Sequence, residues 1–132
     1  MRSRMVATVF DCRDTAALAA FWCAALDFEV TDRWHDAHGT EYVEATADGE
    51  HMLLFHPVPD RKQAKNRVHL DIRAEGPQYD EVARLVALGG RVVADDPAVP
   101  WVVLQDPEGN EFCVLPPESG EQPGSGTQMA EP

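Results

Sequence analysis

The two halves of the chain repeat one another. Residues 48–57 (DGEHMLLFHP) align with residues 106–116 (DPEGNEFCVLP), and residues 6–8 (VAT) align with 68–70 (VHL), at an offset of about sixty residues. Between the aligned segments, each half contains one helix-like pattern. An internal duplication of this kind predicts two copies of one supersecondary unit that bury a common core.

The first half predicts a strand, a helix and three further strands. Residues 5–12 form the first strand, and Asp14 is placed to cap a helix whose apolar residues recur at helical spacing. These apolar residues are Leu18, Phe21, Trp22, Ala25 and Leu26. Strands follow at 28–34, 40–46 and 51–56, and Asp48-Gly49 is a hairpin signal before the last of them.

The second half predicts the same order of elements. A strand at 67–73 precedes a helix that begins near Pro77 and ends at Gly89-Gly90, and short strands follow at 91–94, 101–105 and 111–115. We therefore expect one α+β domain, residues 1–116, made of two βαβββ modules at about 5–57 and 67–116. Each module would be a mixed sheet with one helix on its outer face. Residues 117–132, rich in Pro, Gly, Ser and Glu, are expected to be a disordered tail.

The composition narrows the possible partners. The net charge is −12, with 11 basic against 23 acidic residues, and this excludes nucleic acid and anionic membranes, which are bound by clustered Lys and Arg. No apolar run approaches the ~20 residues of a membrane-spanning helix. The cysteines Cys12, Cys23 and Cys113 form no CxxC pair, so we expect reduced thiols in a cytoplasmic protein.

Strand alternation predicts which side chains face away from the helices and into a crevice between the modules. The side chains expected in the crevice are His69, Asp71 and Arg73 on the fifth strand, Glu111, Cys113 and Leu115 on the last, and Ala7, Val9 and Asp11 on the first. Those expected to face a helix are Val68, Leu70 and Ile72, Phe112 and Val114, and Val6, Thr8 and Phe10. A polar row on an inner face is costly unless it is satisfied or wet, which favours a ligand crevice over a dry core.

Three motifs, in order along residues 5–116, resemble the vicinal-oxygen-chelate superfamily (glyoxalase, bleomycin resistance protein and dioxygenase), in particular its glyoxalase-like subgroup. Residues 14–30, with FW and LDF, are similar to its "D…FY…LGF" run. Residues 69–71 (HLD) resemble a strand of the subgroup, and residues 106–112 (DPEGNEF) resemble the "DPDGN" signature. The resemblance implies cup-shaped sheets that hold a metal or a ligand, and a homodimer.

The resemblance also implies four metal-binding positions, one each on the first, fourth, fifth and eighth strands. They fall on Ala7, on Leu54 with His56 two residues further, on His69 and on Cys113. Alanine and leucine offer no ligand atom, so the implied metal set is incomplete. Glyoxalase I and ring-cleaving dioxygenase activities are therefore not expected, and we predict no metal cofactor, with a divalent metal as the alternative.

His69, Asp71 and Cys113 are the candidate catalytic residues. His69 suits proton transfer near neutrality or metal ligation, or it is a structural histidine bonded to Asp71. Cys113 is a soft ligand, a nucleophile paired with His69, or a small buried filler. Asp71 either forms an ion pair with Arg73 that orients His69, or it caps a turn or faces water.

The candidate ligand-binding residues surround this group. Trp34, Tyr42 and Trp101 would stack on a planar ligand, since aromatic faces bury large area at low entropic cost. Glu111 would be a carboxylate base or a solvated side chain, and Arg73 would join the crevice. His56, with His69 and Cys113, would make a soft triad for zinc if the three converged.

Two functions remain open. The first is a protein that binds a small aromatic or oxygenated metabolite without metal chemistry, for resistance or sequestration, and the incomplete ligand set favours it. The second is a lyase or isomerase in which His69 acts as acid or base, with or without a metal. The inward row of His69, Asp71 and Arg73 favours this one.

Overall fold

The computed structural model describes residues 1–118, so most of the tail expected at 117–132 lies outside the described residues. The chain divides into two compact units, Met1–Lys62 and Gln63–Pro132, which we call the first and second modules. Each module is described by itself below. In the described part of the chain, no helix is both long enough and apolar enough to cross a membrane.

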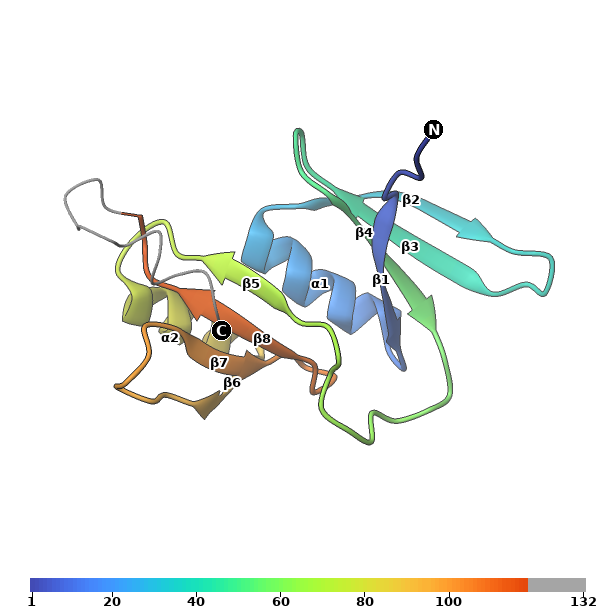
Figure 1. Ribbon diagram of the computed structural model, residues 1–132. Helices are drawn as coiled ribbons and strands as arrows, with labels where there is room; N and C mark the ends of the chain where they lie inside the picture. Colours follow the sequence, from blue (N-terminus) through green and yellow to red (C-terminus); the bar gives the residue numbers. More distant parts are fainter. Residues whose placement is uncertain (119–132) are drawn as a thin grey trace. The chain divides into compact units, whose positions relative to one another are not determined.

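The first module is a four-stranded sheet with one helix (Figure 1). Its elements are β1 (Ala7–Cys12), α1 (Thr15–Leu26), β2 (Glu29–His35), β3 (Glu41–Thr46) and β4 (Met52–Pro57). The strand order is β1-β4-β3-β2, with β1 parallel to β4 and the other neighbours antiparallel.

The second module repeats this arrangement. Its elements are β5 (Leu70–Arg73), α2 (Gln78–Leu88), β6 (Arg91–Ala94), β7 (Val102–Gln105) and β8 (Glu111–Leu115). The order β5-β8-β7-β6, with β5 parallel to β8, matches that of the first module strand for strand. The α+β class and the duplicated βαβββ unit are therefore confirmed.

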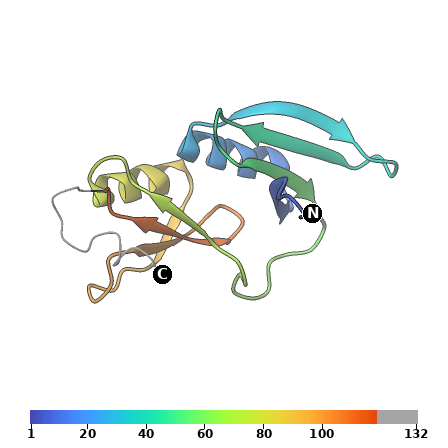
Figure 2. The ribbon, with the colours of Figure 1, turned by 45° about the horizontal axis from the view of Figure 1, so that its top comes forward.

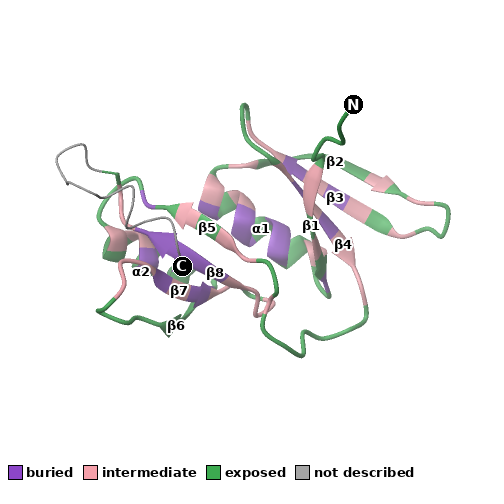
Figure 3. Cartoon of the chain, in the orientation of Figure 1, coloured by how far each residue is buried: buried purple, intermediate pink, exposed green. Residues whose placement is uncertain are grey.

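The helix α1 covers one face of the first sheet (Figure 2). Asp14 caps it, because its carboxylate accepts a hydrogen bond from the Ala17 backbone N–H at 3.0 Å. Phe10 packs against Phe55 and Trp22, at ring-centroid distances of 5.4 and 5.6 Å. The buried residues of α1 and the strands beneath it form the core of the module (Figure 3).

The second core lies between α2 and its sheet. Leu85, Leu104, Phe112 and Val114 are almost fully buried there. The side-chain amide of Gln78 at the start of α2 donates to the carbonyl oxygens of Pro100 and Val114, at 2.8 and 2.9 Å. These bonds tie the helix to β8 and to the loop before β7.

The 106–110 turn that precedes β8 is organised by one buried carboxylate. Asp106 is only 4% exposed and accepts hydrogen bonds from the backbone N–H groups of Glu108 and Asn110, at 2.9 and 3.0 Å. The Asn110 side-chain amide donates to the same carboxylate at 2.9 Å. Gly109 has φ +89°, in the left-handed region that glycine adopts without strain. This motif therefore builds the turn and offers no free group to a ligand.

Two helix-facing positions were predicted wrongly. Val68 is 80% exposed and Val6 is 75% exposed, and both lie outside their strands. The reason is the length of the partner strands. The β5–β8 ladder begins at Leu70 opposite Phe112, and the β1–β4 ladder begins at Ala7 opposite Met52, because turns precede both partners.

Candidate functional site

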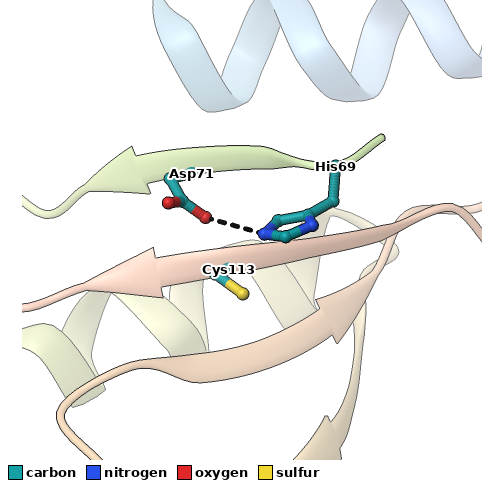
Figure 4. A group of neighbouring side chains, drawn as sticks. All are labelled: His69, Asp71 and Cys113. Carbon is teal, nitrogen blue, oxygen red and sulfur yellow. Dashed lines mark ion pairs between the residues drawn. The ribbon is translucent and has the colours of Figure 1, made fainter. Parts of the chain in front are cut away.

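The second module brings the three predicted catalytic residues together. His69 directly precedes β5, Asp71 lies within β5, and Cys113 is the register partner of Asp71 on β8. The Nε2 atom of His69 is 3.2 Å from Oδ1 of Asp71 (Figure 4). One ligand atom from each of the three side chains lies within 4.8 Å of the other two. We call this group the His69 cluster.

The His69 cluster is partly open. The side chains of His69 and Asp71 are 29% and 31% exposed, so a small molecule can reach them. Cys113 is 4% exposed, and it lies beneath them in the sheet. The contact with Asp71 fixes the orientation of the imidazole, as a carboxylate partner does for many functional histidines.

The environment of Cys113 opposes a nucleophilic role. Burial, followed by the negative charge of Asp71, raises the pKa of the thiol from 9.0 to about 11. The thiol is therefore protonated at neutral pH, whereas nucleophilic attack needs the thiolate. This geometry favours Cys113 as a packing residue over Cys113 as a nucleophile paired with His69.

The three side chains of the His69 cluster carry the types of ligand atom that bind zinc in proteins. Histidine nitrogen, carboxylate oxygen and cysteine sulfur all bind zinc at 2.0–2.3 Å, and three protein ligands leave one position open. All three ligand atoms lie within 4.8 Å of one another, which is close enough for small side-chain adjustments to bring them around one ion. Ala7 in β1 and Leu54 in β4 offer no ligand atoms.

Arg73 and Glu111 contact residues that the sequence did not single out. Arg73 forms an ion pair with Glu118, at 3.6 Å, and donates to the Pro116 carbonyl oxygen at 3.0 Å. Of the two alternatives left open for Asp71, the ion pair with Arg73 is therefore disfavoured, because Asp71 contacts His69 and the arginine at the end of β5 reaches the segment that follows β8. Glu111 accepts hydrogen bonds from the Asn66 backbone N–H and the Gln105 amide, at 2.9 and 3.3 Å, and is not simply solvated.

The first module holds a second group, which sequence reasoning found only in part. The rings of Trp34, Tyr42 and His56 stand parallel on neighbouring strands, at centroid distances of 4.2 and 4.8 Å and interplanar angles of 8° and 4°. We call them the aromatic ladder. The sequence singled out all three residues, but it did not predict that they stack on one another.

Three carboxylates hold the polar atoms of the aromatic ladder. The His56 Nδ1 atom is 3.0 Å from Asp11, the Trp34 indole N–H donates to Glu44 at 2.7 Å, and the Tyr42 hydroxyl is 3.4 Å from Asp36. Sequence reasoning missed Glu44 and Asp36. Strand alternation could have found Glu44, because it lies two residues after Tyr42 and on the same face of β3.

The third predicted aromatic residue, Trp101, is half-buried and lies one residue before β7. Its role in binding stays a prediction. His56 was considered as part of a zinc triad with His69 and Cys113. In the structure its imidazole contacts Asp11 and stacks on Tyr42 instead.

Comparison with known proteins identifies the family. Residues 7–115 match the model of the glyoxalase-like domain, so the chain belongs to this family within the vicinal-oxygen-chelate superfamily. No curated protein sequence matches the chain.

Solved structures share the fold at low sequence identity. The chain is similar to a mutant of the fosfomycin resistance protein FosX from Listeria monocytogenes, with 17% identity, 92% of this chain and 98% of that chain covered, and TM-score 0.70. It is similar to glyoxalase I of Leishmania major, with 15% identity, 87% of each chain covered and TM-score 0.66. A glyoxalase/bleomycin resistance protein/dioxygenase family enzyme from Burkholderia phytofirmans has 15% identity, 84% and 96% coverage and TM-score 0.65.

Proposed function

We propose that this protein binds a small aromatic or oxygenated metabolite, in a resistance or sequestration role that needs no metal. The observation that carries this proposal is the His69 cluster, where a partly exposed His–Asp pair lies on the sheet beside a protonated thiol. A polar group in this position is costly unless water or a ligand satisfies it. The pair offers a donor and an acceptor to a hydroxyl or carbonyl oxygen.

The incomplete metal set supports binding over metal-dependent catalysis. Ala7 and Leu54 occupy two of the four positions that the family uses for its ion, and neither side chain can be a ligand. The FosX structure to which this chain is similar contains Mn(II) and a dihydroxypropylphosphonic acid. This chain could therefore keep a ligand-binding surface of the same fold without the ion.

The proposal is tested by a thermal-shift screen of aromatic and oxygenated metabolites, followed by calorimetry of the hits in EDTA. Replacing His69 by alanine is expected to weaken binding at least about tenfold, the cost of one hydrogen bond to a polar ligand group. His51→Ala is the matched control, because His51 is an exposed turn histidine of the first module. Binding that vanishes in EDTA, or that survives His69→Ala unchanged, would contradict the proposal.

A lyase or isomerase is the second candidate, and the contact between His69 and Asp71 favours it. With the Nε2 hydrogen directed to Asp71, the Nδ1 atom of His69 keeps its lone pair and could take a proton from a substrate carbon or oxygen. A divalent ion, if present, would be held by His69, Asp71 and Cys113 and would polarise a substrate oxygen.

Turnover separates the two candidates. An enzyme would convert a hit of the screen into product, and Asp71→Asn would reduce kcat more than it changes binding, because the amide no longer orients the imidazole as a charged partner does. A hit that binds tightly and is recovered unchanged, with and without added zinc, would remove the enzyme from consideration.

A further inference from the structure

The aromatic ladder belongs to a row of side chains that crosses the whole first sheet. Asp11 on β1 pairs in register with His56 on β4, and Trp34 on β2 pairs with Tyr42 on β3. The β3–β4 register, Val43 opposite Phe55, continues by one residue to place Tyr42 opposite His56. The row therefore contains Asp11, His56, Tyr42 and Trp34, in the order of the strands.

The two ends of the row differ. The ring separations of 4.2 and 4.8 Å are close to the spacing of hydrogen-bonded strands, about 4.8 Å, so each strand contributes one ring and the next ring stacks on it. At the β1 end the row finishes on a carboxylate instead of a ring. At the β2 end it finishes on the indole of Trp34, and β2 is the last strand of this sheet. The outer face of Trp34 therefore has no neighbouring strand in its own module.

The charges along the row have one sign. Asp11, Asp36 and Glu44 each contact the polar atom of one ring, and none of the three contacts a lysine or arginine in the part of the chain that the structure describes. Hydrogen bonds from the backbone N–H groups of Thr40 and His38 lower the pKa of Asp36 although desolvation opposes them, so this carboxylate is ionised at neutral pH. A ring hydrogen-bonded to a carboxylate has an electron-rich face, which attracts cations.

We propose that the outer face of Trp34 binds a planar organic cation, such as an amidinium or a protonated aromatic amine. The cation would extend the aromatic ladder by one ring and would find its counter-charge in Glu44, which already holds the Trp34 indole at 2.7 Å. An anion would be repelled here, in keeping with the net charge of −12. This inference goes beyond the proposed function, since it assigns a second binding surface, in the first module, with its own class of ligand.

The test compares benzamidinium with benzamide, two planar molecules of nearly the same shape that differ in charge. Binding is followed through the indole N–H resonance of Trp34 in nitrogen-15 NMR spectra of the full chain, assigned with Trp34→Leu. We expect benzamidinium to bind at least about tenfold more tightly than benzamide, the difference that a cation–π contact with a nearby carboxylate supplies. Calorimetry, which does not depend on the Trp34 resonance, should show that Trp34→Leu abolishes binding of benzamidinium. By the same measurement, Glu44→Gln should remove most of the advantage of benzamidinium over benzamide.

His51→Ala is the control variant, because His51 is an exposed histidine that belongs neither to the aromatic ladder nor to the His69 cluster, and its loss should leave benzamidinium binding unchanged. Equal affinity for the two molecules in the unmodified protein would overturn the inference, and this comparison needs no variant to fold. If metabolites of the screen bind through His69 while benzamidinium shows no preference, the inference fails and the proposed function stands. If no molecule binds in either experiment, both fail.

Discussion

Asp71 and Cys113 are register partners in the parallel β5–β8 pair, and the carboxylate adds its negative charge to the burial that already raises the pKa of the thiol to about 11. The thiol therefore lies beneath the His69–Asp71 pair as a neutral group. The carboxylate of Asp71 therefore stabilises the neutral form of the thiol. The rate at which Cys113 reacts should depend on whether Asp71 carries its negative charge.

Alkylation of Cys113 should be slow at pH 8 and should rise steeply only as the pH approaches 11, because only the thiolate reacts. Asp71→Asn removes the charge that opposes ionisation, so the midpoint of the rate profile should move to lower pH. Iodoacetamide labelling with peptide mass spectrometry measures the rate at Cys113, and urea-unfolded protein gives the unhindered reference. An unchanged midpoint in Asp71→Asn would show that Asp71 does not act on the thiol.

The same pKa shift predicts a loss of stability in alkaline solution. The thiol ionises near pH 9.0 in the unfolded chain and near 11 in the folded protein, so between these values the unfolded state binds fewer protons and becomes relatively more favourable. The free energy of unfolding should therefore fall by about 1–2 kcal/mol across this window, beyond the fall seen in Cys113→Ala. Urea titrations of both proteins at pH 8 and pH 10.5 measure the difference. Parallel pH dependences in the two proteins would refute it.

The Asp106 turn should be a major source of stability in the second module. Asp106 is 4% exposed and its carboxylate accepts hydrogen bonds from the backbone and side chain of Asn110, so Asp106→Ala leaves part-buried donors without this acceptor. We expect a loss of about 2–3 kcal/mol, and a smaller loss for Asp106→Asn, which keeps one acceptor oxygen. Thermal or urea unfolding measures both variants.

Asp48→Ala is the matched control for this experiment. Asp48 begins the corresponding hairpin of the first module, but it is exposed, so its removal should change stability by no more than about 0.5 kcal/mol. Equal losses at the two positions would mean that burial of Asp106 contributes nothing.

Local patterns were enough to predict the fold but not the side-chain pairing. Strands 91–94 and 111–115 were predicted with the bounds that β6 and β8 have, because alternation and flanking turns are local signals. The outward position of Val68 could not be predicted, since the end of a ladder depends on the length of the partner strand. The sequence also placed His69, Asp71 and Cys113 on one face of the sheet, because alternation along a strand predicts which side chains share a face.

Which residue each charged side chain contacts depends on the register between strands that are distant in sequence. A pairing of Arg73 with Asp71, two residues away, was one of the two alternatives considered, but Arg73 reaches Glu118. His56 contacts Asp11 across 45 residues of sequence, a pairing that exists only because β1 lies beside β4 in parallel register. No local signal in the sequence specifies that register, and so the carboxylates of the aromatic ladder were not assigned in advance.

Metal analysis of the purified protein gives the sharpest test of the His69 cluster. The proposed function expects well under one equivalent of zinc, iron, nickel or manganese per chain, and an unchanged melting temperature in EDTA. The Cys113 thiol, whose pKa is raised to about 11, must lose its proton before it can ligate an ion, and this cost weakens metal binding at neutral pH. Inductively coupled plasma mass spectrometry and differential scanning calorimetry measure the two quantities. One equivalent of metal that is lost in His69→Ala but retained in His51→Ala would instead make the cluster a metal centre, and the lyase or isomerase would then be the better account of the protein.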